Sequence, residues 1–141
     1  MRQEQLRGLS KWRELAAEEA LELVGFHARR DIAYILSTST LFAGTIKACR
    51  NAKDTEALYK KFGKWREPDG YSPRIGDFVV HYGAFDNAEL KGHGINCGFV
   101  YSDDGKKLTV IGLDHRGMIN FYNLDKDNQR IKGYCCPSYG Q

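Results

Sequence analysis

Three strand-like segments follow one another in the middle of the chain, at 75–82, 92–101 and 108–114. Each is rich in β-branched and aromatic residues and is bounded by Gly, Asp or Asn, which is typical of consecutive strands. The Asp-Asp-Gly-Lys segment at 103–106 favours a tight reversal between the second and the third, because Gly tolerates a positive φ and Asp can cap its own turn. The sequence therefore predicts three antiparallel strands of one sheet.

The first half of the chain has the apolar spacing of helices instead. Ser10 can cap a first helix that ends at Gly25, and Asp54 can cap a third, shorter one. Between them, the Ser and Thr residues at 37–40 are expected to begin a second helix. The stretch 26–36 fits either a short helix or an extended segment. The apolar residues expected on the inward faces are Trp12, Leu15, Ala16, Ala20, Leu23 and Val24 in the first helix, Phe42, Ala43, Ile46 and Cys49 in the second, and Ala57, Leu58 and Phe62 in the third.

Further strands at 118–122 and 131–137 complete the expected sheet. The prediction is an α+β fold in which N-terminal helices pack on a twisted antiparallel sheet of about five strands, from Asp77 to Cys136. The second helix should pack its apolar face on the centre of this sheet. The residues expected to be buried together are Trp12, Leu15, Phe42, Ile46, Phe78, Val80, Phe99 and Val110.

A length of 141 residues and a hydrophobic content of 42% fit one folded domain over 1–141. The net charge of +3 is too small to indicate a nucleic-acid partner by itself. No run approaches the roughly 18 apolar residues that a membrane span needs, and the N-terminus lacks the apolar segment of an export signal. We therefore expect a protein made in the cytoplasm without a signal peptide, with no membrane partner.

The four cysteines lack the paired Cys-x-x-Cys spacing of a zinc site. No His and Asp pair shows metal-ligand spacing either, so neither a metal nor a cofactor is expected. Free cysteines are usually buried, and reduced thiols are the expectation here. His81 and His115 are expected at a sheet edge or in a loop.

A basic and aromatic patch lies just before the sheet. Its cations are Lys60, Lys61, Lys64 and Arg66, and they are interleaved with Tyr59, Phe62 and Trp65. Cations interleaved with aromatic rings are typical of surfaces that bind glycans or nucleic acids. The alternative is a solvated helix end whose Lys stems cover apolar surface.

The strand signals, taken in order, resemble a known family. Gly-Asp at 76–77 opens an apolar strand, the segment 96–100 has the form polar-apolar-Gly-apolar-Val, and 112–114 closes the third strand on small residues and a polar one. This order resembles the core of the NlpC and CHAP group of papain-like cell-wall hydrolases, phage-borne members most of all. The resemblance runs from about Trp12 to Pro137, which is nearly the whole chain.

In the resembling hydrolases the catalytic Cys sits at the start of the second helix, where the helix N-terminus lowers the pKa of a thiol. Matching Phe42 to the family's apolar residue after the nucleophile puts Ser39 at this position, with Thr38 as a one-residue alternative. Matching the second strand puts Asn96 where the general-base His stands. A different alignment, through Gly-His, makes His93 the base.

Asp114 matches a family position that orients the imidazole. The alternative is a turn residue that caps the following Arg-Gly pair. A hydroxyl needs a strong adjacent base to act as a nucleophile, and Asn cannot serve as one.

The resemblance, with Cys and His replaced, implies a degenerate cell-wall-hydrolase-like module that is a pseudoenzyme. We expect a phage-type structural or peptidoglycan-binding component whose partners are peptidoglycan or other phage structural proteins, with a place in the virion. The alternative is an active peptidoglycan amidase or endopeptidase that uses Ser39, His93 and Asp114. A nucleic-acid-binding domain would rest on the basic patch alone, so a nucleic-acid partner is not expected.

Overall fold

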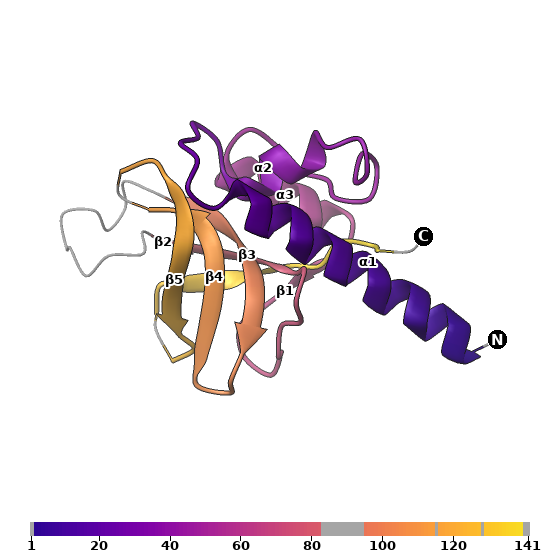
Figure 1. Cartoon of the computed structure of the whole chain (residues 1–141). Coiled ribbons are helices and arrows are strands. Elements are labelled where there is room, and N and C mark those ends of the chain that lie inside the picture. The colour runs from indigo at the N-terminus through magenta and orange to yellow at the C-terminus, as the bar shows by residue number, and fades with distance from the viewer. Residues whose placement is uncertain (1, 83–94, 115, 128, 140–141) are drawn as a thin grey trace.

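The chain is described by a computed structural model that covers residues 2–82, 95–114, 116–127 and 129–139, with side chains from residue 11 onward. The helices are α1 (Arg2–Leu23), α2 (Ile32–Ser37) and α3 (Ala52–Lys61). The strands are β1 (Trp65–Arg66), β2 (Phe78–Tyr82), β3 (Ile95–Asp103), β4 (Lys107–Leu113), β5 (Ile119–Asp125) and β6 (Ile131–Cys135). Figure 1 shows the three helices gathered on one side of the sheet. The predicted α+β class is confirmed.

All six strands form one antiparallel sheet in the order β1-β6-β2-β3-β4-β5. The segment from β2 to β5 is a meander of neighbouring strands, as the sequence predicts for its first three members. The chain then crosses back, so that β6 pairs with the free edge of β2. The remaining strand, β1, has only two residues and was not expected. It pairs with β6, with Trp65 opposite Cys135.

Helix α1 begins well before the expected cap at Ser10, which lies inside the helix. The residues before it are mostly good helix formers, so the helix continues through this position. The helix ends as expected, because Gly25 adopts φ 97° and its amide donates to the carbonyl of Ile119 at 2.8 Å. Gly25 thus ties the end of α1 to the start of β5.

The Ser and Thr residues at 37–40 do not begin a helix, so the expected start of the second helix is wrong. Ser37 and Thr38 instead close α2. Ser37 Oγ donates to the carbonyl of Tyr34 at 2.5 Å, and Thr38 Oγ1 donates to that of Ile35 at 2.7 Å. Hydroxyl side chains that bond backwards to carbonyls satisfy the end of a helix, whereas a cap at the start accepts from amides. The segment that follows forms turns, although its apolar Phe42 is fully buried.

Helix α3 begins one turn earlier than expected, with Asn51 as its cap. Its side chain accepts a hydrogen bond from the amide of Asp54 at 2.8 Å. The buried positions of α3 are Ala52, Thr55, Glu56 and Tyr59, which follow the i, i+3, i+4, i+7 pattern of one helix face. The expected inward face is therefore wrong: Ala57 is exposed, and Phe62, which follows the helix, is 55% exposed.

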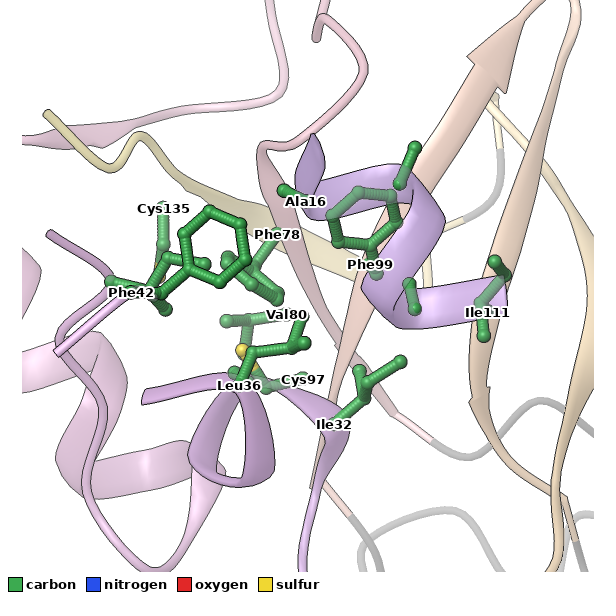
Figure 2. Packing of buried hydrophobic residues seen from close by; sticks show 14 of the residues in the cluster. Ala16, Ile32, Leu36, Phe42, Phe78, Val80, Cys97, Phe99, Ile111 and Cys135 are labelled. Carbon is green, nitrogen blue, oxygen red and sulfur yellow. The ribbon is translucent and has the colours of Figure 1, made fainter. Parts of the chain in front are cut away.

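The sheet buries apolar residues on both faces. Most of the expected core lies in the cluster between the helices and one face, with Phe42, Ile46, Phe78, Val80 and Phe99 buried in it and Trp12 and Leu15 half-buried against it. Figure 2 shows how α2 and the following turns bring Leu36 and Phe42 beside Val80 and Phe78.

Val110 belongs to a second cluster on the other face, with Val79, Val100, Leu108, Leu124, Ile131 and Tyr134. Successive side chains of a strand point to opposite faces, and in β4 it is Ile111 that points to the helices. The expectation that Val110 joins the helix-side core is therefore wrong. Among the helices that the structure describes, none is both long and apolar enough to cross a membrane.

Candidate functional site

The start of α2 lies against β3. Asp31, the residue before the first turn, has its carboxyl group largely buried, and burial raises its pKa to about 6. A hydrogen bond from the backbone amide of Cys97 works in the opposite direction and lowers this pKa, but less strongly. The first helical residue, Ile32, is fully buried. The helix start that meets β3 thus presents an aliphatic side chain and a carboxyl group held by the strand.

Ser39 does not lie at a helix start. Its amide donates to the carbonyl of Leu36, and its own carbonyl accepts from the amides of Phe42 and Ala43. The helix start that does lie beside β3 is that of α2, and its first residue is Ile32. An aliphatic side chain has no group that could attack a carbonyl.

Asn96 lies on β3 opposite His81 of β2. Its neighbour Cys97 belongs to the helix-side cluster, so by strand alternation Asn96 lies on the face away from α2. No hydrogen bond or ion pair joins Ser39, Asn96 and Asp114 within the part of the chain that the structure describes. His93 lies outside the described residues.

Asp114 is held inside the turn between β4 and β5. Its Oδ1 accepts from the amides of Arg116 at 2.8 Å and Met118 at 3.1 Å. Its Oδ2 accepts from the guanidinium of Arg116 at 3.0 and 3.3 Å. Burial raises the pKa of Asp114, these bonds lower it, and the net shift is downward. All four interactions fit the role of a turn residue.

The predicted basic patch divides into two parts. Lys60 forms an ion pair with Glu56 at 2.7 Å, and its ammonium lies 5.1 Å from the centre of the Trp65 ring. The Trp65 ring packs so closely on β6 that a Cβ at Gly133 would lie 2.2 Å from it. Trp65 is thus part of the packing between β1 and β6, whereas Lys60 is exposed and lies over the ring of Trp65. Lys61 and Arg66 are exposed, whereas Lys64 is half-buried.

Lys64 lines a pocket of about 340 Å³ beside the end of α3. The other lining residues are Gly44, Thr45, Lys47, Leu58, Tyr59, Phe62, Cys136, Pro137 and Ser138. The pocket thus joins the turns after α2, the end of α3 and the segment after β6. Sequence reasoning found Lys64 but missed Lys47, which stands 17 residues earlier in a segment read as helix.

Sequence reasoning also missed the environment of His81, which is fully buried in β2 and does not lie at an edge. Its Nδ1 lies 2.6 Å from the carbonyl of Tyr82, and its Nε2 lies 2.8 Å from the hydroxyl of Tyr122. A carbonyl only accepts, so Nδ1 carries the proton and Nε2 accepts from the Tyr122 hydroxyl. Burial lowers the pKa of His81 to about 4, which keeps the imidazole neutral.

A second buried polar network ties the N-terminal helix to the sheet. Arg13 of α1 forms an ion pair with Asp77 at 3.1 Å, and Tyr71 donates to the same carboxylate at 2.6 Å. The sulfur of Cys136 lies 3.2 Å from the Tyr71 hydroxyl, whose proton goes to Asp77, so the thiol donates. Burial raises the pKa of Cys136, which disfavours a thiolate nucleophile there.

Within the described residues, no group of three or more His, Cys, Asp and Glu side chains is placed to hold a metal ion. No protein-family model matches the chain, and no curated protein matches it.

Proposed function

We propose that this chain is a degenerate cell-wall-hydrolase-like module that binds without cleaving, as a phage-type structural or peptidoglycan-binding component. The resemblance supplies the ligand class. The observation that carries the absence of catalysis is the junction of α2 and β3. At that junction Ile32 begins the helix, and the neighbouring carboxyl group of Asp31 accepts a hydrogen bond from the backbone amide of Cys97.

A papain-like hydrolase needs a thiolate and an imidazole in contact, because the two act as one unit. Here Ser39 follows the helix and Asn96 lies on the other face of the sheet. The alternative, an active hydrolase using Ser39, His93 and Asp114, needs a free carboxylate oxygen to orient the imidazole. Both oxygens of Asp114 already accept two hydrogen bonds each within its turn.

Binding is proposed to use three cations of the basic patch, the exposed Lys61 and Arg66 and the half-buried Lys64, toward the carboxylates and sugars of the wall polymer. Co-sedimentation with purified sacculi tests this. We expect the protein to pellet with the sacculi, and Lys61→Gln with Lys64→Gln to lower the bound fraction. Lys106→Gln with Lys107→Gln is the matched control, because it removes the same charge from two exposed residues where the β3–β4 turn meets β4. Protein that stays in the supernatant would contradict the binding half of the proposal.

A further inference from the structure

The pocket beside the end of α3 has a consistent chemical character. Its apolar surface comes from Leu58, Phe62 and Pro137, with the ring of the buried Tyr59 beside them. Thr45 and Ser138 add hydroxyl groups. Two cations, Lys47 and Lys64, stand in the lining, and no carboxylate does. At about 340 Å³ the pocket is within the range of small-molecule sites, at its lower end.

The cations of this pocket are not paired with any carboxylate of the described residues. Neither Lys47 nor Lys64 has an ion-pair partner among the residues that the structure describes. The Nζ atom of Lys47 instead lies 5.0 Å from the centre of the Phe62 ring, and that of Lys61 lies 6.0 Å from it. The Phe62 ring is 55% exposed and has ammonium groups beside it. A planar anion could therefore place its apolar body on the ring and its charged group near an ammonium group.

One feature of α3 opposes an anion. The C-terminal end of a helix carries a partial negative charge of about half an elementary charge. The carbonyls of this end are already used, because those of Leu58, Tyr59 and Lys60 accept from residues of the following turn. Two full positive charges outweigh the remaining dipole.

The walls of the pocket are fixed by backbone contacts. Gly63 adopts φ 70°, which turns the chain so that the Lys64 amide donates to the carbonyl of Tyr59 at 2.8 Å. The carbonyl of Lys64 in turn accepts from the Cys136 amide at 3.0 Å, which anchors the C-terminal segment beside it. Tyr139 then donates to the carbonyl of Gly76 and is buried. The α3 side and the C-terminal side of the pocket are therefore in place before any ligand arrives, which reduces the entropy cost of binding.

We propose that this pocket binds a small organic anion with a planar apolar body, the body against Phe62 and the anionic group between Lys47 and Lys64. The pocket contains no residue of the α2–β3 junction, and the inference does not depend on whether the cell wall is the target of the protein. A carboxylate and a phosphate share the required chemistry.

Ligand titrations followed by amide chemical shifts of the whole chain test the proposal. The probes are 2-naphthoate, 2-naphthyl phosphate and the neutral 2-naphthalenemethanol. We expect saturable binding of at least one anion with a Kd of about 1 mM or tighter, and markedly weaker binding of the neutral alcohol. The anion that binds more tightly identifies the ligand as a carboxylate or a phosphate. Added salt should weaken the binding of the anions alone.

Variants locate the site. Lys47→Gln and Lys64→Gln should each weaken the binding of the anion by about threefold to fivefold. Phe62→Ala should weaken the binding of both the anions and the alcohol. Lys53→Gln, on the exposed surface of the same helix and outside the lining, is the control and should bind as the parent does. Absence of saturable binding, equal affinity for the neutral alcohol, or unchanged affinity in both lysine variants would overturn the proposal. The sacculus assay is a separate readout, so either proposal can fail alone.

Discussion

The hydroxyl of Tyr122 donates to Nε2 of His81 over 2.8 Å and thereby joins two strands that are not neighbours. Tyr122 lies on β5 and His81 on β2, with β3 and β4 between them. The tyrosine reaches across because both intervening positions are glycine. A Cβ at Gly98 or at Gly112 would lie 2.7 Å from the Tyr122 hydroxyl. The two glycines thus create the space for a buried polar contact on the outer face of the sheet.

Adding one methyl group in this space should destabilise the fold. We expect Gly112→Ala to lower the free energy of unfolding by about 1 to 3 kcal/mol, because the tyrosine must move and the buried imidazole loses its donor. Chemical denaturation measures the change. Ser102→Ala, at an exposed position of β3, is the control and should change stability by less than about 0.5 kcal/mol. A Gly112→Ala protein as stable as the parent would show that the tyrosine is not fixed where we describe it.

Two groups with shifted pKa values, the half-buried Asp31 and the buried His81, should give opposing pH dependences. The pKa of Asp31 is raised from 3.8 to about 6, so the folded state binds a proton more tightly and stability falls as pH rises from about 4 to 6. The pKa of His81 is lowered from 6.5 to about 4, so the unfolded state binds the proton more tightly and stability falls as pH drops over the same window. Each shift corresponds to about 3 kcal/mol, and in the parent the two largely cancel.

Replacing Asp31 with Asn separates the two effects. The amide oxygen can still accept from the Cys97 amide, but it does not titrate. Relative to the parent, Asp31→Asn should gain up to about 3 kcal/mol between pH 4 and pH 6, and its own stability should fall more steeply toward acid. Unfolding curves at several pH values test this. A constant difference between parent and variant over this range would show that Asp31 has an ordinary pKa.

The ion pair of Arg13 with Asp77 should be costly to break. Asp77 is fully buried, and it also accepts from Tyr71 and from the amide of Arg74. We expect Arg13→Met to cost about 3 to 5 kcal/mol, because it leaves a buried carboxylate without its cation. Arg74→Met removes an exposed cation nearby but keeps the amide, and should cost less than about 0.5 kcal/mol. Equal losses in the two variants would contradict a special role for the buried pair.

The sheet was largely predictable from the sequence, and the reason is local. Strands β3 and β4 are joined by a turn in which Asp103 and Asp104 accept from backbone amides of the next residues, as the Asp-Asp-Gly segment predicts. The two-residue β1 was not predictable, because it depends on pairing with a strand about 70 residues later. The burial of Val110 on the outer face was not predictable either. Strand alternation shows which residues share a face, but not that this face is covered by a second apolar cluster.

The helical half was harder to predict because hydroxyl residues can close a helix as well as begin one. Ser37 and Thr38 bond backwards to carbonyls, a choice that no local pattern determines. The register of α3 failed for a different reason. Its buried face includes Glu56, which a search for apolar residues excludes, and which is tolerated because Lys60 and Lys132 pair with its two carboxylate oxygens.

The candidate site could be predicted only in part. Lys64 was found from the charge pattern, but Lys47 joins it through the fold. The position of Asp114 in a turn was one of two predicted roles, and its hydrogen bonds favour that role. The location of Ser39 depended on an expected helix start that the fold places seven residues earlier, at Ile32 of α2.

If the protein binds cell-wall material without cleaving it, as we propose, the most direct test is to measure the release of soluble fragments from purified sacculi by the full chain. We expect no release above the buffer control, even at protein concentrations at which the sacculi retain the protein. The parent should also be indistinguishable from Ser39→Ala, because the hydroxyl lies in a turn after α2. Release of fragments by the parent that disappears in both Ser39→Ala and His93→Ala would contradict the account and identify an active hydrolase.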